Sequence, residues 1–151
     1  MKFLVILFSI ISLNVFSQDI ATRKKHYLTD KGIAINGYDP VAYFQGKPQQ
    51  GKKEFSYNQE GIIYQFVNAS NLENFKKNPV KYEPQYGGWC AFAMGSKGEK
   101  VVVDPETYKI INGKLYLFYH TFFNNTLTDW NKDEANLKAK ADINWEKTLK
   151  K

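Results

Sequence analysis

The chain has very little cysteine, histidine and methionine. Its 151 residues include one cysteine, two histidines and two methionines. A single cysteine excludes a disulfide within the chain, so a stable fold must rest on the packing of apolar side chains. The scarcity of sulfur and imidazole groups also excludes the multi-ligand spacings of common zinc sites. A metal site in this chain would have to combine single residues from distant positions.

Arginine is almost absent as well, since Arg23 is the only one. The formal charge of +6 at pH 7 therefore comes from lysines, which are spread along the chain as separate pairs. A nucleic-acid groove favours clustered arginines interleaved with aromatic platforms. The lysine pattern instead indicates a solvated surface and excludes nucleic acid as a partner. It leaves room for weak attraction to anionic surfaces or acidic ligands.

Long apolar runs are missing except at the N-terminus. Lys2 precedes an almost wholly apolar stretch at residues 3–11, and Ser17 ends a motif of the kind that signal peptidase cleaves. The apolar stretch is shorter than the about 20 residues that span a bilayer. We therefore expect residues 1–17 to be a signal peptide. The chain from Gln18 is expected to be secreted or periplasmic, without stable insertion in a membrane.

The remaining chain is long enough for one domain with a real core. Aromatic residues make up 16% of the sequence and supply a large apolar area per buried residue. Residues 18–31 are polar and basic, so we interpret them as an N-terminal arm or an early helix outside the core. His26, in this arm, is expected to be exposed. Residues 32–149 are expected to form the folded domain.

Turn signals and apolar spacing indicate the elements of that domain. Residues 54–67 predict a β-hairpin, and the valines at 101–103 predict a further strand. Asn112 and Gly113 are a strong signal for a second hairpin, because both residues accept a positive φ. From Asn131 onward, apolar residues spaced four apart predict a C-terminal helix. The fold class is therefore α+β, a small single domain of antiparallel hairpins packed with helices.

The most informative internal segment is Gly87–Met94, which joins a glycine pair to a thiol, a thioether and two aromatic rings. Cys90 and Met94 would share one face of a helix. A thiolate with a thioether suits soft Cu(I), and His120 would add an imidazole if the fold brings it near. These three residues are compatible with copper or haem iron. They are equally typical of core packing, because free cysteine is often buried and methionine fills gaps.

A small-ligand pocket is the second candidate site. Its rim would combine Tyr38 and Asp39 with Tyr86, Trp89 and Cys90. Aromatic side chains with polar tips often line such pockets, and the glycines after Tyr86 would let a ligand approach the backbone. The alternative is a core with hydroxyl groups at its edge. Asp39 also precedes a proline, which is typical of a helix cap.

Three motifs occur in order along the domain: Gly-Tyr-Asp-Pro-Val-Ala-Tyr-Phe at 37–44, Pro-Gln-Tyr-Gly-Gly-Trp-Cys-Ala at 84–91, and Ala-Asp-Ile-Asn-Trp at 141–145. With this order and spacing, the chain resembles secreted bacterial YHS-domain-containing proteins over nearly all of its length after the signal peptide. The broader YHS group includes small metal-handling modules with three cysteines. The matching positions here are Ala42, Val67 and Asn71, so the resemblance implies no multi-cysteine site and leaves Cys90 alone.

Three functions follow as hypotheses. The first is an exported domain that binds a small molecule or a soft metal ion around Gly87–Met94. The second is a thiol-dependent redox or hydrolytic enzyme in which Cys90 acts with His120. The third is a non-catalytic interaction module for a partner in the cell envelope. The position of the Cys90 sulfur distinguishes them, because a site needs an accessible sulfur and a packing role needs an enclosed one.

Overall fold

The first half of the chain is built on a small four-stranded sheet. The computed structural model describes residues 19–151, so the predicted signal peptide lies outside the described residues. The strands have the spatial order β1 (Thr29–Asp30), β2 (Ile33–Ala34), β4 (Ile62–Phe66) and β3 (Lys52–Gln59). The β3–β4 pair is the antiparallel hairpin predicted for residues 54–67, whereas β2 and β4 pair in parallel.

The second half contains two further strand pairs. The hairpin of β5 (Asp104–Ile111) and β6 (Lys114–Phe118) turns through Asn112 and Gly113, whose φ angles of 50° and 73° confirm the predicted turn. A short ribbon follows, made of β7 (His120–Thr121) and β8 (Asn124–Asn125). The strand predicted at residues 101–103 is wrong. Its Val101 carbonyl instead accepts a hydrogen bond of 2.9 Å from the Cys90 N–H.

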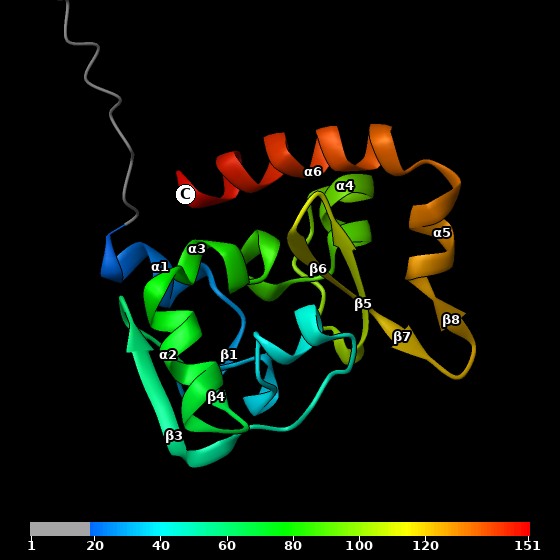
Figure 1. The fold of residues 1–151 in the computed structure, drawn as a ribbon. Helices are drawn as coiled ribbons and strands as arrows, with labels where there is room; N and C mark the ends of the chain where they lie inside the picture. The colour runs from blue at the N-terminus through cyan, green and yellow to red at the C-terminus, as the bar shows by residue number, and fades with distance from the viewer. Residues whose placement is uncertain (1–18) are drawn as a thin grey trace, which may run out of the picture.

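Helices surround these strands (Figure 1). They are α1 (Ile20–His26), α2 (Ala69–Lys77), α3 (Pro79–Tyr82), α4 (Ala91–Lys97), α5 (Thr126–Lys132) and α6 (Glu134–Leu149). Three short 3₁₀ segments join them: η1 (Ile35–Gly37), η2 (Ala42–Gln45) and η3 (Gln85–Gly88). The predicted C-terminal helix exists, but it begins at Glu134 and a break at Asp133 separates it from α5. The predicted α+β class is confirmed, and in the described part of the chain no helix is long and apolar enough to cross a membrane.

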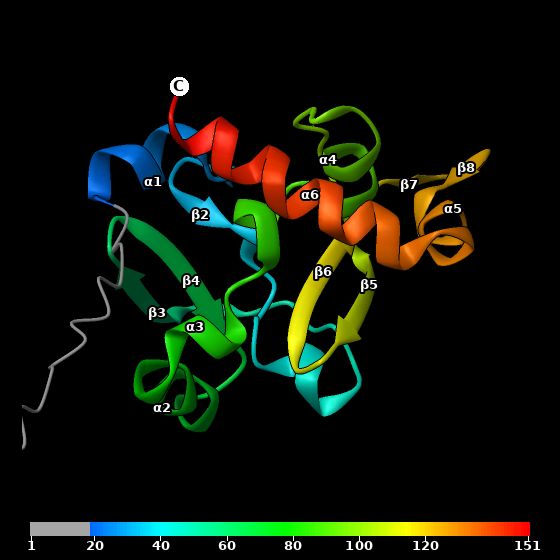
Figure 2. The same cartoon turned by 90° about the horizontal axis from the view of Figure 1, so that it is seen from above.

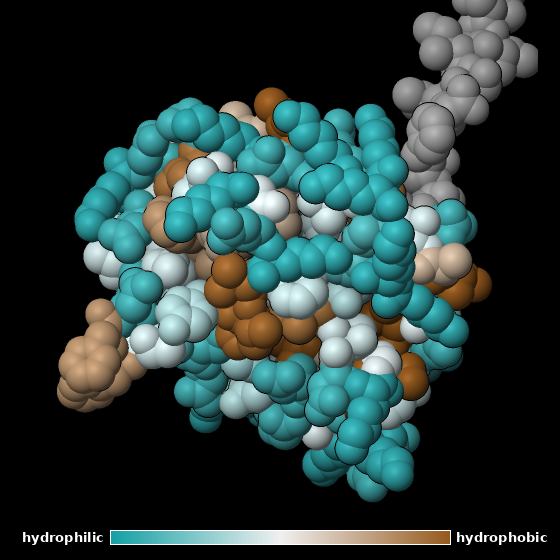
Figure 3. All heavy atoms as spheres, turned by 180° about the vertical axis from the view of Figure 1, so that it is seen from behind, coloured by the Kyte–Doolittle hydropathy of each residue, from teal (hydrophilic) through white to brown (hydrophobic). Residues whose placement is uncertain are grey.

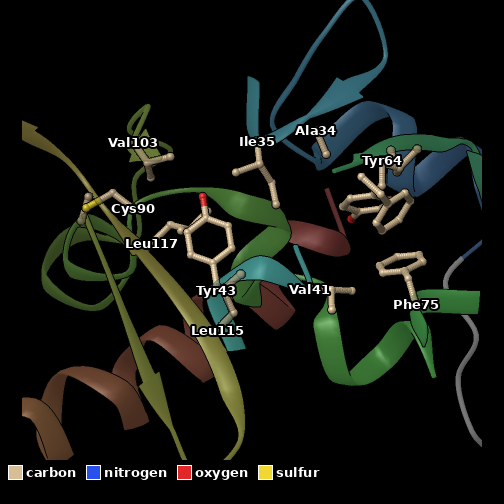
Figure 4. Packing of buried hydrophobic residues seen from close by; sticks show 13 residues of the cluster. Ala34, Ile35, Val41, Tyr43, Tyr64, Phe75, Cys90, Val103, Leu115 and Leu117 are labelled. Atoms are coloured by element: carbon tan, nitrogen blue, oxygen red, sulfur yellow. The ribbon is translucent and has the colours of Figure 1, made fainter. Parts of the chain in front are cut away.

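Two buried clusters form the core. The first lies between the four-stranded sheet and the β5–β6 hairpin, and Figure 4 shows part of it, including Tyr43, Phe75 and Cys90. The second lies under α6 and contains Met94 and Trp130. Figure 2 shows α6 crossing the molecule beside α4. The two helices approach closely, because a Cβ on Gly95 would lie 2.4 Å from the backbone oxygen of Leu137.

The N-terminal segment packs against the domain through helix α1. Arg23 is only 4% exposed and His26 only 5%, so the prediction that His26 is exposed is wrong. His26 is covered on the side where Trp89 and Lys100 contact it, and Arg23 is covered because α1 lies against the turn between β3 and β4. There the Arg23 guanidinium donates to the backbone oxygens of Gln59 and Glu60 at 3.3 and 3.2 Å. A basic segment is thus held by one buried cation that composition alone does not reveal.

Candidate functional site

The Gly87–Met94 segment is positioned by an unusual backbone turn. Tyr86, Gly87 and Gly88 all have positive φ angles, of 56°, 60° and 88°. A Cβ on Gly87 would lie 2.8 Å from the ring of Trp145, which belongs to α6. The glycine pair therefore fits a tight turn packed against a helix. Close approach of a ligand, the other interpretation of these glycines, is not needed to account for them.

The Cys90 sulfur is enclosed. Cys90 is 0% exposed and stands immediately before α4, within the first core cluster. Figure 4 shows its side chain on the side of the cluster where Val103 and Leu117 lie. Its polar neighbours come from the ends of the β7–β8 ribbon: the Tyr119 N–H donates to the sulfur at 3.3 Å, and the Thr126 hydroxyl lies 3.4 Å from it.

The direction of the Cys90–Thr126 hydrogen bond follows from proton counting. The Thr126 hydroxyl has one proton, which it donates to the Tyr119 carbonyl oxygen at 2.7 Å. Its oxygen is therefore left to accept from the thiol, so the Cys90 S–H donates to Thr126 while the sulfur accepts from the Tyr119 N–H. The thiol thus links Tyr119, just before β7, to Thr126, just after β8.

The three predicted metal ligands are not brought together as one site. Met94 packs in the second core cluster, away from the cluster that holds Cys90. The His120 side chain is 39% exposed, and its Nδ1 lies 2.8 Å from the Thr107 hydroxyl and 3.6 Å from an Asp104 carboxylate oxygen. Within residues 19–151 no group of three or more histidine, cysteine or acidic side chains has the arrangement of a metal site.

Trp89 connects the segment to the N-terminal helix. Its indole N–H donates to the His26 backbone oxygen at 2.7 Å, and the Lys100 ammonium lies 5.6 Å from the centre of its ring. The same ammonium lies 3.1 Å from His26 Nδ1. Because an ammonium only donates, Nδ1 is the acceptor and the neutral imidazole carries its proton on Nε2. Burial, followed by the charges of Lys100 and Lys25, lowers the pKa of His26 below its ordinary 6.5.

This lowered pKa predicts a pH dependence of stability. The unfolded chain takes up a proton at His26 near pH 6.5, whereas the folded chain resists protonation until lower pH. The contribution of neutral His26 to the free energy of unfolding is therefore fully present above pH 6.5, and it is lost as the pH falls toward the lower pKa of the folded state. We expect the free energy of unfolding, measured in urea, to fall less steeply between pH 7.5 and 5.5 in His26→Gln than in the wild type. Equal slopes would contradict this assignment.

The hydroxyl groups of the two predicted rim tyrosines bond carboxylates on other elements. Tyr86 is 3% exposed and its hydroxyl donates to Asp142 at 2.8 Å. Burial and this bond raise its pKa, so it remains a neutral donor. Tyr38 is half-buried and its hydroxyl donates to Glu106 at 3.1 Å. Each tyrosine fits the alternative interpretation, a core side chain with its hydroxyl at the edge.

Asp39 is a buried structural acceptor. It is 0% exposed, and its carboxylate accepts the N–H groups of Val41 and Ala42 at 2.7 and 3.2 Å. The predicted short helix is the 3₁₀ segment η2, but it begins at Ala42 with Val41 at the cap position, so Asp39 holds the turn before the helix and is not its cap. The carboxylate also accepts the Val67 N–H at 2.9 Å and the Asn71 amide at 2.7 Å. The fold thus gathers Ala42, Val67 and Asn71 around one carboxylate.

A small hollow lies beside the Tyr38–Asp39 motif. Its volume is about 210 Å³, and its lining residues are Asp30, Ile33, Asn36, Gly37 and Gln65. The backbone next to it is strained, because Ile35 has a φ of 53° although its side chain is β-branched. Tyr38 and Asp39 themselves do not line the hollow. The predicted rim and the observed hollow are thus neighbours in the chain but not the same site.

Among residues 19–151, the most exposed large apolar side chains belong to none of the predicted sites. Phe122 and Phe123, at the tip of the β7–β8 ribbon, are each 93% exposed. Their rings pack edge to face, with centroids 4.9 Å apart and an interplanar angle of 84°. The ribbon projects from the body in Figure 1, and Figure 3 shows an apolar knob on that side of the molecule. The sequence signal for this exposed tip is the pair of adjacent phenylalanines between polar residues.

Comparisons with known proteins add no further identification. The chain matches no family model, no curated protein and no solved structure. The resemblance to YHS-domain-containing proteins therefore stays a prediction. The fold and the surface define an α+β domain with an enclosed thiol and an exposed aromatic tip.

Proposed function

We propose that this chain is an exported, non-catalytic interaction module that docks through the tip of its β7–β8 ribbon, residues 120–125. The observation that carries the proposal is the pair Phe122 and Phe123, each 93% exposed. Burying an aromatic side chain is strongly favourable, so two adjacent rings held in water indicate a surface with a partner. Of the three hypotheses, the interaction module is the one this surface supports.

The surroundings of Cys90 favour this proposal over the thiol-based hypotheses. A nucleophilic thiol needs a base within hydrogen-bond reach and an approach route for its substrate. The polar neighbours of the enclosed sulfur are a backbone N–H and a threonine hydroxyl. The His120 ring faces Thr107 and Asp104 instead. The contacts of the sulfur are explained if Cys90 fixes the base of the ribbon, and they require no catalytic or metal-binding role for the thiol.

Site-specific photo-cross-linking tests the proposal. A benzophenone amino acid would replace Phe123 in cells that produce and export the chain, and a matched variant would carry it at Val80, which is 74% exposed on α3. We expect adducts with protein or lipid at position 123, weaker adducts after Phe122→Ser, and none above background at position 80. Equal labelling at both positions, or none at 123, would contradict a docking role for the tip.

A further inference from the structure

We propose that the partner of the tip is an anionic lipid surface, an inference that rests on the docking function proposed above. Phe122 and Phe123 pack edge to face and remain 93% exposed, so they form a convex wedge of two rings. A wedge of this kind fits the boundary between headgroups and acyl chains, where phenylalanine is a common anchor.

The apolar area of the tip is too small for a standard protein interface. A phenylalanine buries about 150–250 Å² at most, so two rings offer about 400 Å². Each partner in a standard protein complex buries about 800 Å². The tip supplies about half of that area, and the flanking two-residue strands add little. A bilayer needs no matching rigid surface, so it accepts a two-ring anchor that a protein partner would bind too weakly.

The sequence around the tip carries no negative charge. Thr121, Asn124 and Asn125, which flank the rings, are uncharged, and no carboxylate occurs between His120 and Thr128. The next acidic residue, Asp129, is paired with a lysine at 2.7 Å. The full chain carries a formal charge of +6, which becomes +5 for the chain from Gln18 because Lys2 is removed. An anionic headgroup layer therefore attracts the protein and meets no repelling group on the ribbon.

The ribbon presents the rings from a rigid base. Thr126 donates to the Tyr119 carbonyl oxygen through its N–H at 3.1 Å and through its hydroxyl at 2.7 Å. The Tyr119 N–H in turn donates to the Cys90 sulfur, which is buried in the core. Because these bonds already order the ribbon before it docks, less conformational entropy is lost on docking. The buried Cys90 thiol thus supports docking indirectly, because it helps to hold the ribbon tip in place.

Vesicle flotation tests the lipid inference, with the chain from Gln18, the form expected after signal cleavage. The vesicles would contain phosphatidylcholine alone or phosphatidylcholine with phosphatidylglycerol. We expect binding to the anionic vesicles to exceed binding to the neutral ones by about tenfold or more, and to fall by about tenfold in Phe122→Ser/Phe123→Ser. Val80→Ser, which removes an apolar side chain that is 74% exposed elsewhere on the surface, should bind as the wild type does. Circular dichroism should show unchanged folding in both variants.

Two outcomes would overturn the lipid inference. One is binding that survives the double substitution, which would show attraction by lysines alone. The other is absence of binding to either vesicle. Cross-linking at position 123 then separates the two proposals: protein adducts without vesicle binding would retain the docking function and reject the lipid partner. Neither adducts nor vesicle binding would reject both.

Discussion

Replacing Asp39 with alanine is expected to lower the free energy of unfolding by about 3–5 kcal/mol. The carboxylate accepts hydrogen bonds from Val41, Ala42, Val67 and Asn71 in a fully buried site. Its removal leaves the Val41 and Val67 N–H groups without this acceptor, while the Ala42 N–H keeps the Asp39 backbone oxygen at 3.2 Å and the Asn71 amide keeps Gln45 at 3.4 Å. Each unpaired buried group costs about 1–3 kcal/mol before relaxation, and the weakened bonds add to this loss. Urea unfolding followed by tryptophan fluorescence would measure the loss.

Two further variants make this prediction specific. Asp30→Asn removes an exposed carboxylate beside the hollow and should change stability by less than about 0.5 kcal/mol. Asn71→Ala removes one of the four donors and should cost about 1–2 kcal/mol, which keeps the test informative if Asp39→Ala does not fold. Stability of Asp39→Ala within 1 kcal/mol of the wild type, on the order of a single weak bond, would contradict the structural role.

Arg23→Met is expected to cost about 3–5 kcal/mol, because it leaves a partly buried carboxylate without its cation. Arg23 pairs with Glu83, and the two side chains are 5% and 13% exposed. The Tyr64 hydroxyl donates to the same carboxylate at 3.1 Å. The guanidinium also bonds the backbone oxygens of Gln59 and Glu60, which joins α1 to the sheet. Thermal and urea unfolding would measure the effect.

An exposed ion pair is the matched control. Lys76 and Glu73 pair at 3.2 Å with side chains 41% and 57% exposed, so Lys76→Met should change stability by less than about 1 kcal/mol. Adding Glu83→Gln to Arg23→Met removes the unpaired charge and should recover part of the loss. If Arg23→Met proves as mild as Lys76→Met, the buried pair does not hold α1 to the domain.

Local features of this fold could be predicted from the sequence. The turn at Asn112 and Gly113 depends on two adjacent residues and is confirmed. The Asp39 side chain does bond the N–H groups two and three positions on, although η2 begins only at Ala42. The α+β class follows from such short-range signals summed along the chain. The break at Asp133 was not visible, because apolar spacing continues across it from α5 into α6.

The candidate site depended on contacts between distant segments. The partners of Cys90 lie 29 and 36 residues further along the chain, and Glu83 lies 60 residues from Arg23. Helical spacing placed Met94 one turn from Cys90, but the two side chains pack in different clusters, because Cys90 precedes the first turn of α4. Periodicity gives the face of a helix and does not say which cluster each residue enters.

The reactivity of the Cys90 thiol tests the central claim that this residue is an enclosed structural anchor and not a catalytic or metal-binding group. The native protein would be mixed with a chromogenic disulfide reagent, with and without denaturing urea. Our account predicts modification at least about 1,000-fold slower in the native state, at a rate that follows opening of the fold. A native thiol that reacts as fast as the unfolded one would contradict it and return Cys90 to the candidate catalytic or metal-binding residues.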